Sequence, residues 1–185
     1  GTIRCSNLCS EIVEFTDEKN IAVCNLASIS LPRFVKTKNP NESKFADSDI
    51  GDPNKYFDFK HFGKIVELAT ENCGKVIRTN LYTSNDTKRA NMDQMAIGLG
   101  VQGLADTFAE MNLPWDDECM GKKGSGGKNI HPQTKKLNIE IFSTMYYFAL
   151  KKSNELARKY GPYSKFVGSP ASKGILQFHM WGVEP

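Results

Sequence analysis

Three side chains near the start of the sequence could carry out chemistry on one small molecule. In "SNLCSEI", residues 6–12, a carboxamide, a thiol and a carboxylate alternate as Asn7, Cys9 and Glu11. In an extended chain, side chains two positions apart point to the same side. We therefore expect these three groups to share one face. A nucleophilic or hydrogen-abstracting sulfur, a base and an orienting amide together indicate a catalytic site, because burying an unpaired carboxylate for structural reasons alone is costly.

A second thiol follows in the apolar run "NIAVCNLASISL", residues 20–31. Both faces of this run are mostly apolar or small, which predicts a strand buried on both sides. Ile21, Val23, Ala27 and Ile29 would form one face, and Cys24 would lie on the other with Ala22, Leu26 and Ser28.

Helices are predicted to follow this strand. Apolar residues at three- and four-residue steps predict a helix over about 58–78, with Cys73 as a buried core thiol. A second helix is expected to start near Val101 and to end before Pro114. A long helix capped by Thr134 should reach Tyr160 and stop at Gly161. Polar loops are expected at 36–55 and 116–133, and the tail should be loop with one short helix. The pattern is typical of an α/β fold.

Two glycine-rich stretches resemble nucleotide-binding motifs but lack the required context. "GLGVQG", Gly98 to Gly103, has no clear strand before it and no suitably placed acidic residue after it. We interpret it as a tight turn into a closely packed helix. "GKKGSGGK" departs from the phosphate-loop pattern, since Lys128 is followed by Asn129, and a solvated linker is the better interpretation. Cys119, just before it, is expected to be an exposed bystander.

Composition excludes several classes of protein. The chain has 185 residues, 39% hydrophobic and 24% charged, which is ordinary for a soluble globular domain. A net charge of +3 without a basic stripe does not indicate nucleic acid as a partner. No apolar run is long enough to span a membrane. Five cysteines without a secreted-type spacing favour a reducing, cytoplasmic location. We expect the chain to be a piece of a longer protein.

Four blocks of the sequence resemble one enzyme family. "CSNLCSEI", "VCNLASI", "IGLGVQGLADTF" and "GPYSKFVGSPASKGILQFHMW" are similar, in order and approximate spacing, to the large catalytic subunit of class I ribonucleotide reductase, in its eukaryotic-type branch. The chain departs from the family near residues 38–54 and 117–133, and both stretches look like insertions in surface loops.

The resemblance implies a fold and a set of chemical roles. The chain would be a fragment of a ten-stranded α/β barrel, with the catalytic finger loop and following strand over 1–35, an inserted surface loop over 36–55, helices over 56–115, a flexible insertion over 116–133, and a long helix with the tail over 134–185. Cys9 would become a thiyl radical and Glu11 the general base. Asn7 would hold the ribose hydroxyls, Leu8 would contact substrate, and Cys24 would be one member of a redox pair whose other thiol lies outside this chain.

The resemblance also implies partners and cofactors. The substrate would be a ribonucleoside diphosphate, reduced to the deoxyribonucleotide. The radical would come from a small subunit holding a di-iron tyrosyl radical, and electrons from a thioredoxin- or glutaredoxin-like reductant. A large-subunit homodimer is expected, and ATP and deoxynucleotide effectors would bind outside this fragment. The fragment itself would bind no cofactor or metal and would be inactive alone.

Two alternatives remain open on the residues. A Cys-dependent hydrolase or transferase would need a histidine near Cys9, and the candidates are His61 in the predicted first helix and His179 in the tail. A non-catalytic binding module would tolerate the substitution Cys9→Ser.

Overall fold

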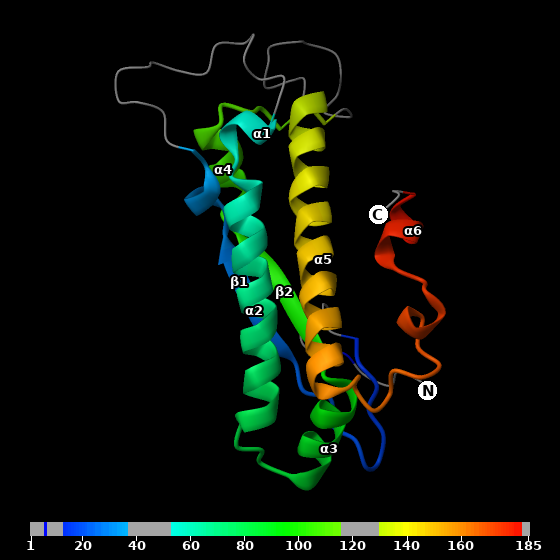
Figure 1. Cartoon of the computed structure of the whole chain (residues 1–185). Coiled ribbons are helices and arrows are strands. Elements are labelled where there is room, and N and C mark those ends of the chain that lie inside the picture. Colours follow the sequence, from blue (N-terminus) through cyan, green and yellow to red (C-terminus); the bar gives the residue numbers. More distant parts are fainter. Residues whose placement is uncertain (1–5, 7–12, 37–52, 116–129, 183–185) are drawn as a thin grey trace. The chain divides into compact units, whose positions relative to one another are not determined.

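The computed structural model describes residues 6, 13–36, 53–115 and 130–182 of the chain (Figure 1). Within them the chain forms two compact units. The first unit contains residues 6, 13–27, 67–100 and 150–182, and the second contains residues 28–36, 53–66, 101–115 and 130–149. Asn7, Leu8, Cys9 and Glu11 lie outside the described residues, so their predicted roles stay predictions.

Two parallel strands pair in a small sheet, β1 (Asn25–Ser30) and β2 (Ile97–Gln102). Parallel neighbours require a crossover connection, and helices supply it here. The chain passes from β1 through a 3-10 turn, Leu31–Phe34, and the helices α1 (Pro53–Tyr56), α2 (Phe59–Thr79) and α3 (Asn85–Gln94) before it enters β2. The structure thus confirms an α/β arrangement.

Strand β1 is shorter than predicted and is buried on one side only. Asn25 and Ile29 are buried, whereas Leu26 between them is 62% exposed. The prediction of burial on both sides is therefore wrong for the described part of the chain, although the alternation itself is as expected and leaves Cys24 exposed.

Strand β2 and helix α3 were not predicted. "GLGVQ" forms the strand rather than the turn, and only Gly103, with φ +72°, makes the expected turn into helix α4 (Leu104–Glu110). A side chain at Gly98 would collide with Leu26 of β1, so the glycine allows the two strands to approach. Helix α3 begins at a capping box in which Ser84 Oγ accepts from Thr87 N at 3.2 Å.

The long helices α2 and α5 (Pro132–Tyr160) run in the same direction (Figure 1). In the second unit, Gly63 of α2 leaves room for the ring of Phe148 on α5, which any larger side chain would overlap. In the first unit, Lys151 Nζ pairs with Glu67 Oε1 at 2.8 Å. Three helix boundaries differ from prediction: α4 starts three residues after Val101, α5 starts two residues before Thr134, and α1 occupies part of the predicted loop at 36–55.

Thr134 is not the cap of α5, because its hydroxyl donates to the Pro114 carbonyl at 2.5 Å from within the helix. Gly161 ends the helix in the left-handed region, φ +84°, as predicted. The tail contains a 3-10 turn, Ala171–Lys173, and one short helix, α6 (Gln177–Trp181).

The cores of the two units differ in kind. In the second unit, the rings of Phe34, Phe57 and Phe62 pack together in tilted and edge-on contacts. In the first unit, the buried set includes Cys73, as predicted, and it contains two asparagine amides; besides Cys73 it comprises Ile77, Ala90, Phe178, Asn25, Thr70 and Asn91. Hydroxyls are buried in the second unit as well, at Thr107 and Thr134, but its described residues bury no asparagine or glutamine. Val76 of α2 and Tyr160 of α5 are more than half exposed. None of the described helices is both long and apolar enough to cross a membrane.

Candidate functional site

The described part of the candidate site is the segment 13–25, here called the Cys24 segment, which connects the stretch around Cys9 to strand β1. Most of it is extended or irregular backbone without a ladder partner. Its backbone groups must therefore be held by side chains and by neighbouring elements. Helix α3 supplies contacts to Lys19, Ile21 and Asn25 of this segment.

A local turn starts the segment. Asp17 Oδ1 accepts from Lys19 N at 2.8 Å and from the Asn20 amide at 2.9 Å. These hydrogen bonds, first from the Lys19 backbone and then from the Asn20 side chain, lower the pKa of the Asp17 carboxyl, because they favour its charged form. The pKa of Glu14, in contrast, is raised by burial.

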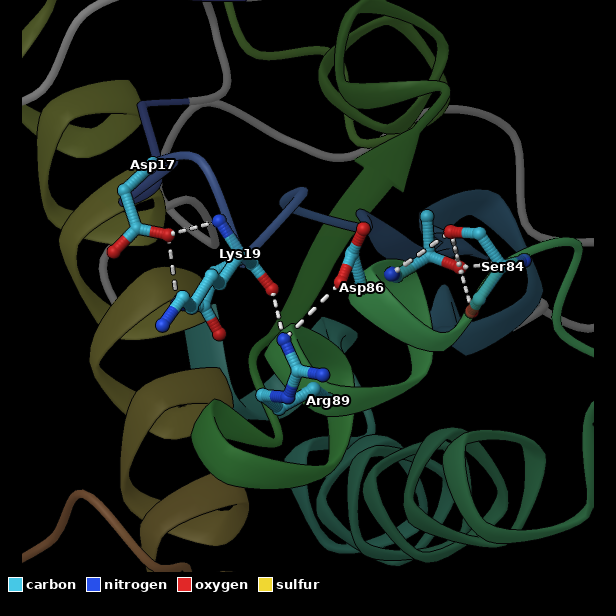
Figure 2. Close-up of polar contacts among 7 residues, drawn as sticks. Asp17, Lys19, Ser84, Asp86 and Arg89 are labelled. Carbon is cyan, nitrogen blue, oxygen red and sulfur yellow. Dashed lines mark hydrogen bonds and ion pairs between the residues drawn. The ribbon is translucent and has the colours of Figure 1, made fainter.

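Arg89 of α3 holds this turn against the helix (Figure 2). Its Nη1 donates to the Lys19 carbonyl at 2.5 Å and to Asp86 Oδ1 at 3.1 Å. The Arg89–Asp86 pair is exposed, so it adds little stability by itself, but it fixes the direction of the guanidinium. Two residues further along the segment, Ile21 N donates to the Asp86 carbonyl at 3.4 Å.

A buried amide pair ends the segment. Asn25 Nδ2 donates to Asn91 Oδ1 at 2.6 Å and to the Ala96 carbonyl at 2.9 Å, and Asn91 Nδ2 donates back to Asn25 Oδ1 at 3.2 Å. Asn91 also donates to Tyr82 Oη at 2.7 Å, and that hydroxyl donates to the Ile77 carbonyl at 2.6 Å. We call Asn25, Asn91 and Tyr82 the amide network. Its two asparagines are 9% and 2% exposed.

The amide network was not predicted from the sequence. One signal was available: Asn25 is a carboxamide inside an apolar run, and a buried amide must find hydrogen-bond partners. The identity of those partners could not be read from the sequence, since Asn91 lies in a polar helix that its pattern does not reveal.

Cys24 lies directly before β1. It is exposed, whereas the next residue, Asn25, is buried. Cys24 thus lies on the same, exposed side of the chain as Leu26, as the alternation in the sequence predicted. Cys73 is buried in α2, and burial raises the pKa of its thiol, which makes it a poor nucleophile.

The structure shows the contacts of both histidines that a Cys-dependent hydrolase could use, His61 and His179. His61 lies on α2 with its ring 5.5 Å from that of Phe34. His179 lies on α6, where its Nδ1 accepts from Leu176 N at 3.1 Å in a capping arrangement. Among the described residues, no group of three His, Cys, Asp or Glu side chains could hold a metal ion.

Comparison with known proteins defines the class. The family model for the ribonucleotide reductase barrel domain matches residues 1–185, so the chain belongs to the ribonucleotide reductase barrel-domain family. The resemblance seen in the sequence is thereby confirmed.

Similar curated proteins are large subunits of ribonucleoside-diphosphate reductase. The chain is 46% identical to the large subunit of Arabidopsis thaliana, 44% to the large chain of Cryptosporidium parvum and 43% to the large subunit of Caenorhabditis elegans. In each case the alignment covers all of this chain but only 21%, 19% and 20% of the relative, respectively. The chain therefore spans about a fifth of the length of these proteins.

Proposed function

We propose that this chain is the part of a ribonucleotide reductase large subunit that carries the reacting thiols, and that the complete subunit reduces ribonucleoside diphosphates to deoxyribonucleoside diphosphates. The observation that carries the proposal is that the family match spans every residue, including the stretch 6–12 and Cys24. Family membership favours this activity over a Cys-dependent hydrolase or a binding module.

In this proposal each predicted residue has one role. Cys9, as a thiyl radical, takes the hydrogen from the ribose 3′ carbon, and Glu11 accepts the 3′-hydroxyl proton. Asn7 hydrogen-bonds the ribose hydroxyls, and Leu8 contacts the substrate. A sulfur radical reacts with thiols and must be kept from water, so a rigid loop inside a barrel of ten strands suits this chemistry.

Cys24 supplies reducing equivalents in the same proposal. Its thiol and a second thiol outside this chain lose two electrons and two protons in total and join as a disulfide. At the substrate, the bond from the 2′ carbon to its hydroxyl breaks, the hydroxyl leaves as water, and hydrogen takes its place. The exposed position of Cys24 supports this role, because a disulfide-forming thiol has to be reached by its partner.

The partners belong to the complete enzyme. A small subunit with a di-iron tyrosyl radical would generate the thiyl radical, and a thioredoxin- or glutaredoxin-like protein would reduce the disulfide. The large subunit would form a homodimer and bind ATP and deoxynucleotide effectors outside this fragment. A reducing, cytoplasmic location would keep Cys24 ready for reaction.

The test uses the complete large subunit with its small subunit, a ribonucleoside diphosphate and a thioredoxin-like reductant. Cys9→Ser and Cys24→Ser should each abolish formation of deoxynucleotide, whereas Cys119→Ser, a thiol with no proposed role, should leave it unchanged. Full turnover by either of the first two variants would overturn the proposal. Turnover lost equally in the Cys119→Ser control would show that any loss of thiol damages the protein.

A further inference from the structure

The hydrogen bonds of the amide network leave no side-chain donor unused. Each asparagine amide has two N–H donors. Asn25 uses its pair on Asn91 and on the Ala96 carbonyl, and Asn91 uses its pair on Asn25 and on Tyr82. The Tyr82 hydroxyl gives its one proton to the Ile77 carbonyl. The Val23 carbonyl lies 3.4 Å from Asn25 Nδ2 as a further, weaker acceptor. Reversing either amide would set like groups of Asn25 and Asn91 against each other, so the network favours one arrangement of its members.

The network joins three places in the first unit to the start of β1. Asn91 belongs to α3, Ile77 to the last turn of α2, and Ala96 to the connection between α3 and β2. That connection is itself set by Met95, which ends α3 in the left-handed conformation with φ +47°. The backbone conformation at Met95 therefore sets the position of the neighbouring Ala96 carbonyl, which Asn25 contacts.

Fixing Asn25 also fixes the direction of Cys24. Side chains of adjacent residues in an extended chain point to opposite sides, so anchoring Asn25 on the buried side directs its neighbour to the open side. The backbone before Cys24 is held as well, by the Arg89 contact to Lys19 and the Ile21 contact to Asp86. Both ends of residues 19–25 thus rest on the same helix, α3.

Disulfide formation depends on this direction. The two Cβ atoms must come within about 3.5–4.5 Å of each other with a narrow range of dihedral angles. A small tilt of β1 would move the Cys24 sulfur out of that range while leaving nucleotide binding and the chemistry at Cys9 in place. Such a tilt would slow the redox step, in which two thiols give up two electrons and two protons and the substrate releases water.

We propose that Asn25 and Asn91 are positioning residues that direct the Cys24 sulfur toward its redox partner. The inference rests on the proposed function, since it assigns a task to a cysteine whose role is itself proposed. Neither asparagine touches substrate in this proposal, and both act through Cys24.

The experiment compares Asn25→Ala with Ser84→Ala in the complete large subunit, assayed with its small subunit. Asn25→Ala removes the amide pair, whereas Ser84→Ala weakens the N-terminus of the same helix and leaves the pair intact. For Asn25→Ala we expect kcat to fall by about 10- to 100-fold, with KM for the nucleotide unchanged within about twofold, the range that an ångström-scale misplacement can cause. Ser84→Ala should keep both values within about twofold of the wild type.

A second measurement follows the redox step of Cys24 directly. The prereduced enzyme is given nucleotide without external reductant, and both the deoxynucleotide formed and the Cys24 disulfide are measured in the first turnover. Asn25→Ala should form both more slowly by the same factor. Should Asn25→Ala fail to accumulate as folded protein, Tyr82→Phe, which deletes only one hydroxyl, should still lower kcat by about three- to fivefold at constant KM.

The outcomes are distinguishable. An unchanged kcat in folded Asn25→Ala, or in Tyr82→Phe where that variant serves as the test, overturns this inference, as does an equal loss in Ser84→Ala. If Cys24→Ser still supports full thioredoxin-driven turnover, the proposed function fails instead. Loss in Cys24→Ser together with normal kcat in the Asn25 variant leaves the function standing and removes only the role of the amide network.

Discussion

The two units of this chain bury different kinds of groups. The second unit packs rings: Phe62 is fully buried, with its ring 5.1 Å from that of Phe34 and 5.7 Å from that of Phe57. The first unit, which holds Cys24, buries the amide network instead. Ring packing is strong but tolerates small shifts, whereas paired amides hold only in one geometry. Under the proposed function, directional contacts are thus used where the Cys24 sulfur must be placed.

The largest effect should come from the second unit. Phe62→Ala should destabilise it by about 3–5 kcal/mol, because the removed ring leaves a cavity among the remaining aromatics. Native-state amide exchange of residues 59–66 in the complete large subunit measures this loss. Lys60→Ala, an exposed position on the same helix, should change exchange little. Equal exchange in the two variants would contradict the assignment of Phe62 to the core.

The amide pair should show coupling. Asn25→Ala and Asn91→Ala should each cost about 1–3 kcal/mol, because each leaves the partner amide buried and unpaired. The double variant should cost less than the sum, with a coupling of about 0.5–3 kcal/mol. Amide exchange of α3 gives all three values. Simple additivity would show that the two asparagines do not depend on each other and would weaken the contrast between the units.

The cap of α3 should matter less. Ser84→Ala removes the acceptor for Thr87 N and should cost about 1 kcal/mol of local stability. Exchange of the first-turn amides of α3 should accelerate accordingly, and Ser84→Asp, which keeps an acceptor, should restore protection. A fully protected first turn in Ser84→Ala would show that the cap contributes nothing.

The smallest effect concerns Cys73. Burial raises the pKa of its thiol above the ordinary value of 9.0, so the unfolded chain loses this proton first as pH rises. The contribution to stability is therefore fully present below about pH 9 and is lost as pH climbs through the raised pKa of the folded state. Amide exchange of α2, compared between pH 8 and pH 10, should reveal this fall of stability with pH. The substitution Cys73→Ala should remove the fall. Identical slopes in both proteins would exclude the thiol as the cause.

Strong periodic patterns in the sequence predicted the helices well. The expected helix at 58–78 is α2, Phe59–Thr79, and the predicted stop at Gly161 is the end of α5. Both helices bury one apolar stripe, and apolar residues at three- and four-residue steps can be recognised directly in a sequence. The buried state of Cys73 followed from the same stripe.

Strand β2 and helix α3, which hold the chain around Cys24, were the elements that the sequence pattern did not predict. Strand β2 contains Gly98 and Gly100, and glycine is a poor indicator of a strand because it has no side chain to alternate. Helix α3 is polar, and its two buried residues are Ala90 and Asn91, which form no apolar stripe. Its position against the Cys24 segment depends on contacts between residues about seventy positions apart, which no local pattern encodes.

The chemistry itself was predicted from residue types and from the family blocks. Family membership supports that assignment, while the placement of Asn7, Leu8, Cys9 and Glu11 remains a prediction. Spacing could suggest that these groups share a face, but it carries no information about the elements that hold them in place.

The bare outer face of β1 has a practical consequence for anyone who makes this polypeptide in the laboratory. Leu26 projects from a sheet that has only two strands in the described part of the chain, and such a sheet rarely persists unsupported in water. Sheet edges that lack a partner strand among the described residues invite other chains to add to them. Expression of these 185 residues alone should yield self-associating material, and co-production with the flanking sequence should keep them dispersed.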